Sequence, residues 1–294
     1  MQHILVTGAR GQVGSELHAL SAQYPQFHFH FTDLPELDLS RPEVVHTFFE
    51  AHPVAYCIHC AAYTAVDKAE SEPEFAQLVN VQAVETLARL CAAHGAGLVH
   101  LSSDYVYHNA LNRPLLPTDP TQPQSVYART KLEGDLKALA LNPCTLVIRT
   151  SWVYSSFGHN FVKTMLRLGR ERDSLGVIYD QIGAPTYARD LADAILHIIS
   201  LSAADERAAD RFRGIYHYSN EGVTSWYDFA KAIFEMEQID CKVLPIPTSA
   251  YPTAAQRPPF SLLDKTATKT DFGLEIPYWR ESLKQCLNII REEH

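Results

Sequence analysis

The chain lacks a long hydrophobic run: among its 294 residues no apolar stretch approaches the ~18 residues that a membrane-spanning helix requires. It also has few positive charges, because 25 Lys and Arg residues stand against 34 Asp and Glu residues, a formal net charge of −9, and they form no basic block. These two absences exclude a membrane-spanning protein and a nucleic-acid-binding protein, which needs a basic surface. The moderate charge content of 20% and the hydrophobic content of 46% are those of a folded globular protein.

Cysteine is also sparse, with six residues and a single CxxC pair, Cys57 and Cys60, inside an apolar strand-like segment. Without a second pair we expect free thiols in a reducing compartment rather than a disulfide or a metal site. The first residues, MQHILVTGARG, show no basic and apolar leader. We therefore expect a cytoplasmic protein.

Short apolar runs alternate with amphipathic stretches over residues 1–150. The predicted strands are His3–Thr7, Phe27–Thr32, Ala55–Cys60, Leu98–Ser102 and Thr145–Thr150, and helices are predicted from Gln12 and over Pro42–Ala51, Glu74–His94 and Ser125–Leu141. Such alternation predicts right-handed βαβ crossovers and an α/β fold of the Rossmann type, with a doubly wound parallel sheet.

The alternation becomes irregular after residue 150. Helices are predicted over Phe161–Gly169, Ala188–Leu201, Ser225–Glu237 and Trp279–Arg291, a strand over Gly214–Tyr218, an exposed loop or helix end over Ser202–Arg213, and an irregular course over Leu244–Pro259. We expect residues 151–294 to form mainly a smaller, interwoven α/β lobe that binds the substrate, with roughly 185–220 returning to the first domain.

A glycine-rich loop, Gly8-Ala9-Arg10-Gly11-Gln12-Val13-Gly14, follows the first strand and opens a helix. Small residues there let the backbone turn sharply and approach a pyrophosphate at a helix N-terminus. Asp33 lies 19 residues beyond Gly14, at the end of the second strand, where a carboxylate can accept hydrogen bonds from a ribose. The alternatives are an ordinary turn and a loop-capping carboxylate. The pattern predicts a dinucleotide site over residues 1–150; Asp33 favours NADH, while Arg10 leaves NADPH open.

Tyr127 and Lys131 form a YxxxK sequence on a predicted helix, so both side chains leave one face. A neighbouring ammonium favours the phenolate, so we expect the pKa of Tyr127 to move toward neutrality; the alternative is an exposed surface pair. Ser103 and Asp104 end the fourth strand, at the sheet edge where such folds bind ligands. Ser103 can hydrogen-bond a substrate carbonyl or cap the turn that follows the strand, and Asp104 can orient substrate hydroxyls or cap the loop.

Several longer stretches carry a more specific resemblance. They are Thr7–Gly14 (TGARGQVG), Ala61–Glu70 (AAYTAVDKAE), Ser102–Tyr107 (SSDYVY), Tyr127–Lys131 (YARTK), Arg149–Tyr154 (RTSWVY), Asn160-Phe161, Asp180–Thr186 (DQIGAPT) and Pro247–Pro252 with Arg257-Pro258. In this order they resemble the dTDP-4-dehydrorhamnose reductase family of the extended short-chain dehydrogenase/reductase superfamily. The resemblance implies NADH- or NADPH-dependent reduction of the C4 keto group of a small nucleotide-linked sugar, by a monomer or a homodimer.

The resemblance also implies residue roles. Tyr127, Lys131 and Ser103 match the catalytic positions; Gly8, Gly11, Gln12, Val13, Gly14, Asp33, Asp38, Leu39, Ala61, Ala62, Tyr63 and Thr64, with Tyr127 and Lys131, match the cofactor site; and Ser103, Asp104, Trp152, Asn160 and Arg257 match substrate contacts. For Asn160 and Arg257 the alternatives are a helix cap and a surface charge. A divalent cation such as Mg²⁺ accompanies some members, but no residues here have compelling ligand spacing, so no metal site is assigned.

Two departures from the family pattern are His59-Cys60, where the family usually has Asn and Ala, and Pro259-Phe260-Ser261, where an Asn often precedes the Ser. Both lie near expected sugar or nucleotide contacts. Two other functions stay open: a nucleotide-sugar epimerase or dehydratase, and a non-catalytic regulatory homologue.

Overall fold

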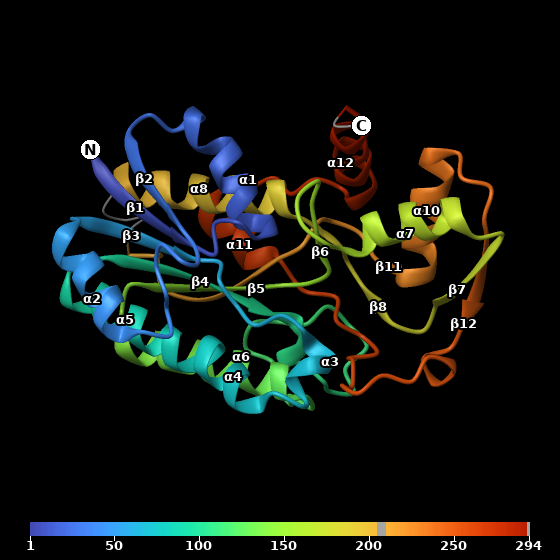
Figure 1. Cartoon of the computed structure of the whole chain (residues 1–294), viewed down its shortest axis with the longest axis horizontal. Helices are drawn as coiled ribbons and strands as arrows, with labels where there is room; N and C mark the ends of the chain where they lie inside the picture. Colours follow the sequence, from blue (N-terminus) through green and yellow to red (C-terminus); the bar gives the residue numbers. More distant parts are fainter. Residues whose placement is uncertain (205–209, 293–294) are drawn as a thin grey trace.

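The centre of the molecule is a six-stranded parallel sheet, seen in a computed structural model that describes residues 1–204 and 210–292 (Figure 1). Its strands are β1 (Gln2–Thr7), β2 (Phe27–Thr32), β3 (Val54–His59), β4 (Gly97–Ser103), β5 (Thr145–Thr150) and β10 (Gly214–Tyr218), in the order β10-β5-β4-β3-β1-β2. The chain leaves β1 toward β2 and then crosses back to β3, so the topological switch point lies at the carboxyl ends of β1 and β3. The predicted Rossmann-type α/β fold is confirmed.

Helices cover both faces of the sheet (Figure 1). The helices α1 (Gln12–Leu20), α8 (Ala188–Ala204) and α11 (Thr266–Phe272) pack on one face, and α2 (Pro42–Ala51), α5 (Ala83–Ala93) and α6 (Val126–Leu141) pack on the other. Alternation along β1 explains the division, because Ile4 and Val6 face the first group and Leu5 faces the second. The helix α8 and the strand β10, from the second half of the chain, pack with this sheet.

A smaller lobe stands beside the sheet, with its own core around Phe229 (Figure 1). Its elements are β6 (Val153–Tyr154), α7 (Phe161–Glu171), β7 (Ser174–Ile178), β8 (Ile182–Gly183), β9 (Thr186–Tyr187), β11 (Thr224–Ser225), α10 (Trp226–Glu237), β12 (Lys242–Ile246) and α12 (Trp279–Glu292). The strands β7 and β12 pair in parallel. No element was predicted over the residues of β7, and the irregular course predicted over Leu244–Pro259 overlaps the second half of β12. A two-stranded pairing gives too short a hydrophobic pattern to be recognised.

The helix predicted over Glu74–His94 is divided into α4 (Pro73–Gln77), a π-helical turn (Leu78–Gln82) and α5. The remaining short elements are α3 (Val66–Ala69) and the 3₁₀ turns Ser21–Gln23, Asp104–Val106 and Thr248–Ala250. In Ser202–Arg213, α8 continues to Ala204, and residues 205–209 lie outside the described part of the chain. Cys57 and Cys60 are free thiols, as expected. Within the described ranges, no helix combines the length and apolar character needed to cross a membrane.

Candidate active site

The glycine loop lies at the switch point, where two backbones approach closely. Gly8 has φ +67°, and a Cβ placed on it would lie 2.6 Å from the backbone N of Ala61. A Cβ on Gly14 would collide with the carbonyl oxygen of Gly8, and Gly11 caps α1 without a side-chain hydrogen bond. The first N–H groups of α1 thus border a narrow cradle of bare backbone, which fits the pyrophosphate of a dinucleotide. Val13 is buried behind this cradle.

Asp33 lies beside the loop at the carboxyl end of β2. Its Oδ2 accepts a hydrogen bond from the backbone N of Arg10 at 3.0 Å, and its Oδ1 accepts one from the backbone N of Leu34 at 2.9 Å. The Arg10 guanidinium donates to the Leu34 carbonyl at 2.8 Å and to Glu36 at 2.5 Å. Asp33 therefore caps the loop, which was the alternative to a ribose contact, and it does so at the carboxyl end of β2, where a ribose contact was expected.

Asp38 is bound within its own turn. Its Oδ1 accepts hydrogen bonds from the backbone N and the hydroxyl of Ser40 at 2.9 and 2.6 Å, and these bonds lower the pKa of the carboxyl group. Leu39 packs against the core under α2 and α5. The two residues shape the loop that follows β2.

The loop Ala61–Thr64 is held by a residue that the sequence analysis missed. Buried Asn80, in the π-helical turn, accepts from the backbone N of Tyr63 at 2.9 Å and donates to the Tyr63 carbonyl at 3.2 Å. Its side-chain amide also donates to Thr130 Oγ1 on α6 at 3.1 Å. A Cβ on Gly134 of α6 would collide with the backbone carbonyl oxygen of Asn80. Two features of the sequence could have revealed this contact: Asn80 is a polar residue inside an apolar helical run, and Gly134 is a glycine within a predicted helix.

Tyr127 and Lys131 are buried on α6, whose N-terminus is capped by the Ser125 hydroxyl. The Ser103 hydroxyl, at the end of β4, accepts a hydrogen bond from the backbone N of Tyr105 at 3.2 Å and donates one to Asp104 Oδ1 at 3.0 Å. It lies close enough to the Tyr127 phenol to oppose the rise of that group's pKa. Lys131 Nζ donates to the Leu101 carbonyl at 2.7 Å. The structure therefore brings the three expected catalytic residues together, and the alternative of an exposed Tyr–Lys pair is wrong.

The expected lowering of the Tyr127 pKa is not found. Burial raises it to about 12, Asp104 and Asp135 add to the rise, and Ser103 opposes it. The Lys131 ammonium donates to the Leu101 carbonyl instead. Burial also lowers the pKa of Lys131 to about 8 and raises that of Asp104 to about 6. Tyr127 is thus a protonated phenol near neutral pH, suited to donate a proton rather than accept one.

A buried polar network centred on Asp135 lies next to Lys131. Burial alone would raise the pKa of Asp135, but His100, Arg149 and Lys131 together lower it. Arg149 Nε donates to Asp135 at 3.1 Å, and His100 Nε2 lies 3.5 Å from the other carboxylate oxygen. His59, one of the two departures, stacks on His100 with ring centroids 5.5 Å apart. Spacing alone could not reveal this network, because its members come from β3, β4, β5 and α6.

The lobe contributes an aromatic surface. Trp152 has φ +50°, a strained backbone conformation for a residue other than glycine, and its ring stacks on Trp226 with centroids 3.8 Å apart. Asn160 accepts a hydrogen bond from the backbone N of Lys163 as the cap of α7, the alternative weighed for it. Its amide also donates to Gln12 Oε1 at 3.1 Å, linking the lobe to the glycine loop.

Arg257 forms a bidentate ion pair with Asp67. Its two Nη atoms donate to the two carboxylate oxygens at 3.1 and 2.6 Å, and the backbone N of Ala255 donates to the same carboxylate at 3.0 Å. The pair joins the loop after β12 to α3, beside the sheet. Arg257 is therefore not a solitary surface charge, because both of its Nη atoms are paired with Asp67.

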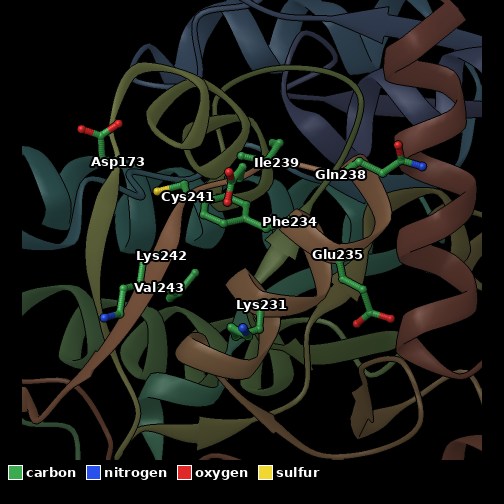
Figure 2. Close-up of a pocket in the computed structure, with 10 residues that line it drawn as sticks. Asp173, Lys231, Phe234, Glu235, Gln238, Ile239, Cys241, Lys242 and Val243 are labelled. Carbon is green, nitrogen blue, oxygen red and sulfur yellow. The ribbon is translucent and has the colours of Figure 1, made fainter.

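A separate depression lies on the lobe between α10 and β12 (Figure 2). Asp173, Lys231, Glu235, Cys241 and Lys242 are among its lining residues. It contains none of the expected catalytic, cofactor or substrate residues.

A buried tyrosine, lysine and serine lie on the same sheet as a backbone cradle that fits the pyrophosphate of a dinucleotide. On a Rossmann-type sheet this is the arrangement of a NAD(P)H-dependent oxidoreductase. Comparison with known proteins makes the assignment more specific. Residues 1–292 match the family model described as the RmlD substrate binding domain.

A dTDP-4-dehydrorhamnose reductase of Aggregatibacter actinomycetemcomitans is 39% identical, over 97% of this chain and 98% of that protein. A crystal structure of the Clostridium acetobutylicum reductase has a TM-score of 0.92 at 37% identity, covering 99% and 100% of the two chains. That of the Bacillus anthracis reductase, in complex with NADP, has a TM-score of 0.89 at 33% identity, covering 98% and 100%. The chain belongs to the dTDP-4-dehydrorhamnose reductase family.

Proposed function

We propose that this chain reduces the C4 keto group of dTDP-4-dehydro-L-rhamnose to give dTDP-L-rhamnose, in the cytoplasm, with NADPH or NADH as reductant. The observation that carries the proposal is the Tyr127–Ser103 pair, buried at the carboxyl end of β4 with Lys131 one turn further along α6. The reduction of a ketone needs a proton for the developing alkoxide, and Tyr127 is positioned and protonated to supply it.

The cofactor site is proposed on the residues around the switch point. Gly8, Gly11, Gln12, Val13 and Gly14 would hold the pyrophosphate; Asp33, Asp38 and Leu39 the adenosine; and Ala61, Ala62, Tyr63 and Thr64 the path toward the nicotinamide. The bound nicotinamide supplies the reducing equivalent. Lys131 would bind the cofactor ribose, and its positive charge at neutral pH follows from a pKa of about 8.

The chemical step requires two side chains. Ser103 donates a hydrogen bond to the substrate carbonyl oxygen and polarises it, and Tyr127 transfers its phenolic proton to the same oxygen. Positioned acid catalysis of this kind is worth roughly 10²–10⁴-fold. Burial of both groups strengthens these interactions because little water competes for them.

The substrate side is proposed on Asp104, Trp152, Asn160 and Arg257. Asp104 adjoins Ser103 and can bind a sugar hydroxyl. Trp152 offers a flat apolar face to the deoxysugar, and its strained backbone is of the kind that clusters at ligand sites. Asn160 lies on the cofactor side of the lobe, and Arg257 can bind the diphosphate by exchanging Asp67 for it.

The test is an assay of the purified protein with nucleotide-linked 4-keto-6-deoxy sugars and either cofactor. We expect loss of reduced-cofactor absorbance in equal amount to the alcohol formed. An epimerase or dehydratase would convert the sugar without net cofactor oxidation. A regulatory homologue would bind cofactor and turn over none of the sugars; either result would contradict the proposal.

A further inference from the structure

A second group of chemically capable side chains lies on the edge strand β2. Its sequence, Phe27-His28-Phe29-His30-Phe31, alternates phenylalanine with histidine. Because successive side chains of a strand point to opposite faces, the phenylalanines turn toward the core under α1 and α8. His28 and His30 therefore emerge together on the other face, the side of α2.

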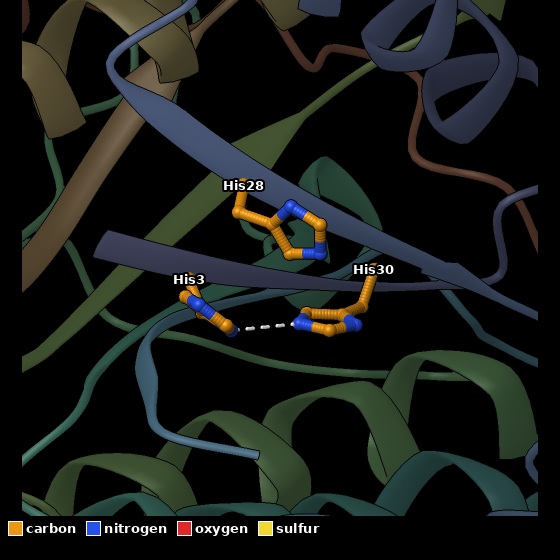
Figure 3. A group of neighbouring side chains, drawn as sticks. All are labelled: His3, His28 and His30. Atoms are coloured by element: carbon orange, nitrogen blue, oxygen red, sulfur yellow. Dashed lines mark hydrogen bonds between the residues drawn. The ribbon is translucent and has the colours of Figure 1, made fainter. Parts of the chain in front are cut away.

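The neighbouring strand β1 adds a third imidazole. His3 pairs in register with His28, and its Nδ1 lies 3.0 Å from Nε2 of His30. One ring nitrogen from each of the three residues lies within 4.8 Å of the other two, and Figure 3 shows the three rings gathered over β1 and β2. His28 is exposed and the other two are half-buried, so solvent reaches the group.

We propose that His3, His28 and His30 form a binding site for a divalent transition-metal ion, with Zn²⁺ as the expected occupant. Imidazole nitrogen is a preferred ligand of Zn²⁺, whereas Mg²⁺ and Ca²⁺ prefer oxygen. The three imidazoles would supply three ligands, and a water molecule would take the fourth position, which solvent reaches because His28 is exposed.

The geometry needs little adjustment. A tetrahedral ion with Zn–N bonds of about 2.0–2.1 Å holds its ligand atoms about 3.3 Å apart. The His3–His30 pair is already at 3.0 Å, and rotation of the exposed His28 ring can close the remainder. The ion would replace the hydrogen bond between His3 and His30.

The protonation state also suits a metal. Burial, together with the neighbouring His52, His28 and His3, lowers the pKa of His30 to about 4. The imidazole is therefore neutral near pH 7, the form that binds metals. On its other side its ring lies against His52 and Phe48 of the α2 region, with centroids 4.5 and 5.6 Å away.

The position in the sheet indicates what the ion would do. His3 and His28 lie at the amino ends of β1 and β2, whereas the glycine loop follows the carboxyl end of β1. A bound ion would tie the edge strand β2 to β1 and stabilise that edge of the sheet, without taking part in the reaction.

The experiment is a calorimetric titration of the untagged, chelator-treated full-length protein with Zn²⁺ alone. We expect one tight equivalent, and affinity reduced about tenfold or more in both His28→Ala and His30→Ala. His46→Ala, which removes an exposed histidine of α2 outside the group, is the matched control and leaves the affinity unchanged. Titration with Co²⁺ gives an independent readout, since tetrahedral nitrogen coordination produces intense visible absorption.

Two results would overturn the proposal. One is Zn²⁺ binding by His28→Ala and His30→Ala that matches the unmodified protein in affinity and stoichiometry. The other is weak binding of several equivalents with no single tight site. Because His28 is exposed, His28→Ala should fold, and it keeps the test valid if His30→Ala does not fold. Unchanged NADPH binding verifies that each variant is folded.

Discussion

Histidines occur at both ends of the central sheet, and their surroundings are opposite. Near the carboxyl ends of the strands, His59 and His100 are almost completely excluded from solvent and stacked on each other. Burial holds the pKa of His59 well below its usual range and lowers that of His100 to about 4, with Lys131 adding to both effects. At the amino ends, His3 and His28 reach solvent. Burial makes the first pair neutral packing elements near Lys131, and exposure leaves the second pair open to ligands.

Two glycines, one near each end of the sheet, also differ in how closely their surroundings pack around them. Gly8 and Gly95 have nearly equal φ angles, +67° and +66°. Gly8, at the carboxyl end, faces the backbone of Ala61, whereas a Cβ on Gly95, which precedes β4, would meet nothing within 4 Å. Of these two glycines, only the one at the end proposed to bind the cofactor is in close contact with another backbone segment. Substitutions at that end should change binding or turnover, and those at the amino end should change neither.

The largest effect is expected for Tyr127→Phe. The variant keeps the buried ring but loses the proton donor, so kcat should fall by roughly 10²–10⁴-fold. NADPH affinity should change little, because Phe preserves the packing against Tyr105. Steady-state kinetics and a cofactor titration measure the two quantities. His28→Ala, at the other end of the sheet, should keep full turnover; equal losses in both variants would remove the functional contrast between the ends.

The two glycines give the next largest effect. Gly8→Ala combines a left-handed backbone strain of about 1–2 kcal/mol with a backbone collision of about 1–3 kcal/mol. Gly95→Ala meets only the strain. Denaturant unfolding should therefore separate the two variants by about 1–3 kcal/mol, and only Gly8→Ala should weaken NADPH binding. Equal stability and equal cofactor affinity would show that the approach of Gly8 to Ala61 is unimportant.

A third prediction uses the titration of Lys131. With a pKa of about 8, its charged fraction falls from about 90% at pH 7 to about 10% at pH 9. The folded-state pKa is lowered, so charge is lost as the pH rises, and NADPH affinity should fall about tenfold over this range. Tyr127→Phe should show the same profile, because a phenol with a pKa of about 12 does not titrate there. Lys131→Met should bind more weakly, with a flatter profile; a profile like that of the unmodified protein would assign the titration to another group.

The sheet and the proposed catalytic residues were predictable because their signals are local. Strand–helix alternation, the glycine loop and the YxxxK spacing each occupy a short stretch of chain. The structure brings Ser103 to Tyr127 because both lie at the carboxyl edge of the sheet, which the order of elements alone indicates.

The interactions around those residues were not predictable for the opposite reason. Asp67 and Arg257 are far apart in sequence, and no pattern pairs them. The pKa of Tyr127 was predicted in the wrong direction because helical spacing reveals neither the burial of the phenol, which raises the pKa, nor the hydrogen bond from the Lys131 ammonium to the Leu101 carbonyl. The histidines of β1 and β2 appear as a group only when the strand register is known.

The smallest expected effect concerns the choice of cofactor. Glu36 holds the Arg10 guanidinium at the edge of the glycine loop, at 2.5 Å, in a largely exposed pair. Glu36→Gln removes that carboxylate and leaves the Arg10 guanidinium held by the Leu34 carbonyl, with its second Nη available to the 2′-phosphate of NADPH. An exposed ion pair is worth about 0.2–1 kcal/mol, so the ratio of kcat/KM for NADPH to that for NADH should rise by roughly one and a half- to fivefold. Glu43→Gln breaks a comparably exposed pair with Arg41, outside the loop, and should leave the ratio unchanged. A shift of equal size in both variants would mean that net charge, rather than the freed Arg10, sets the preference.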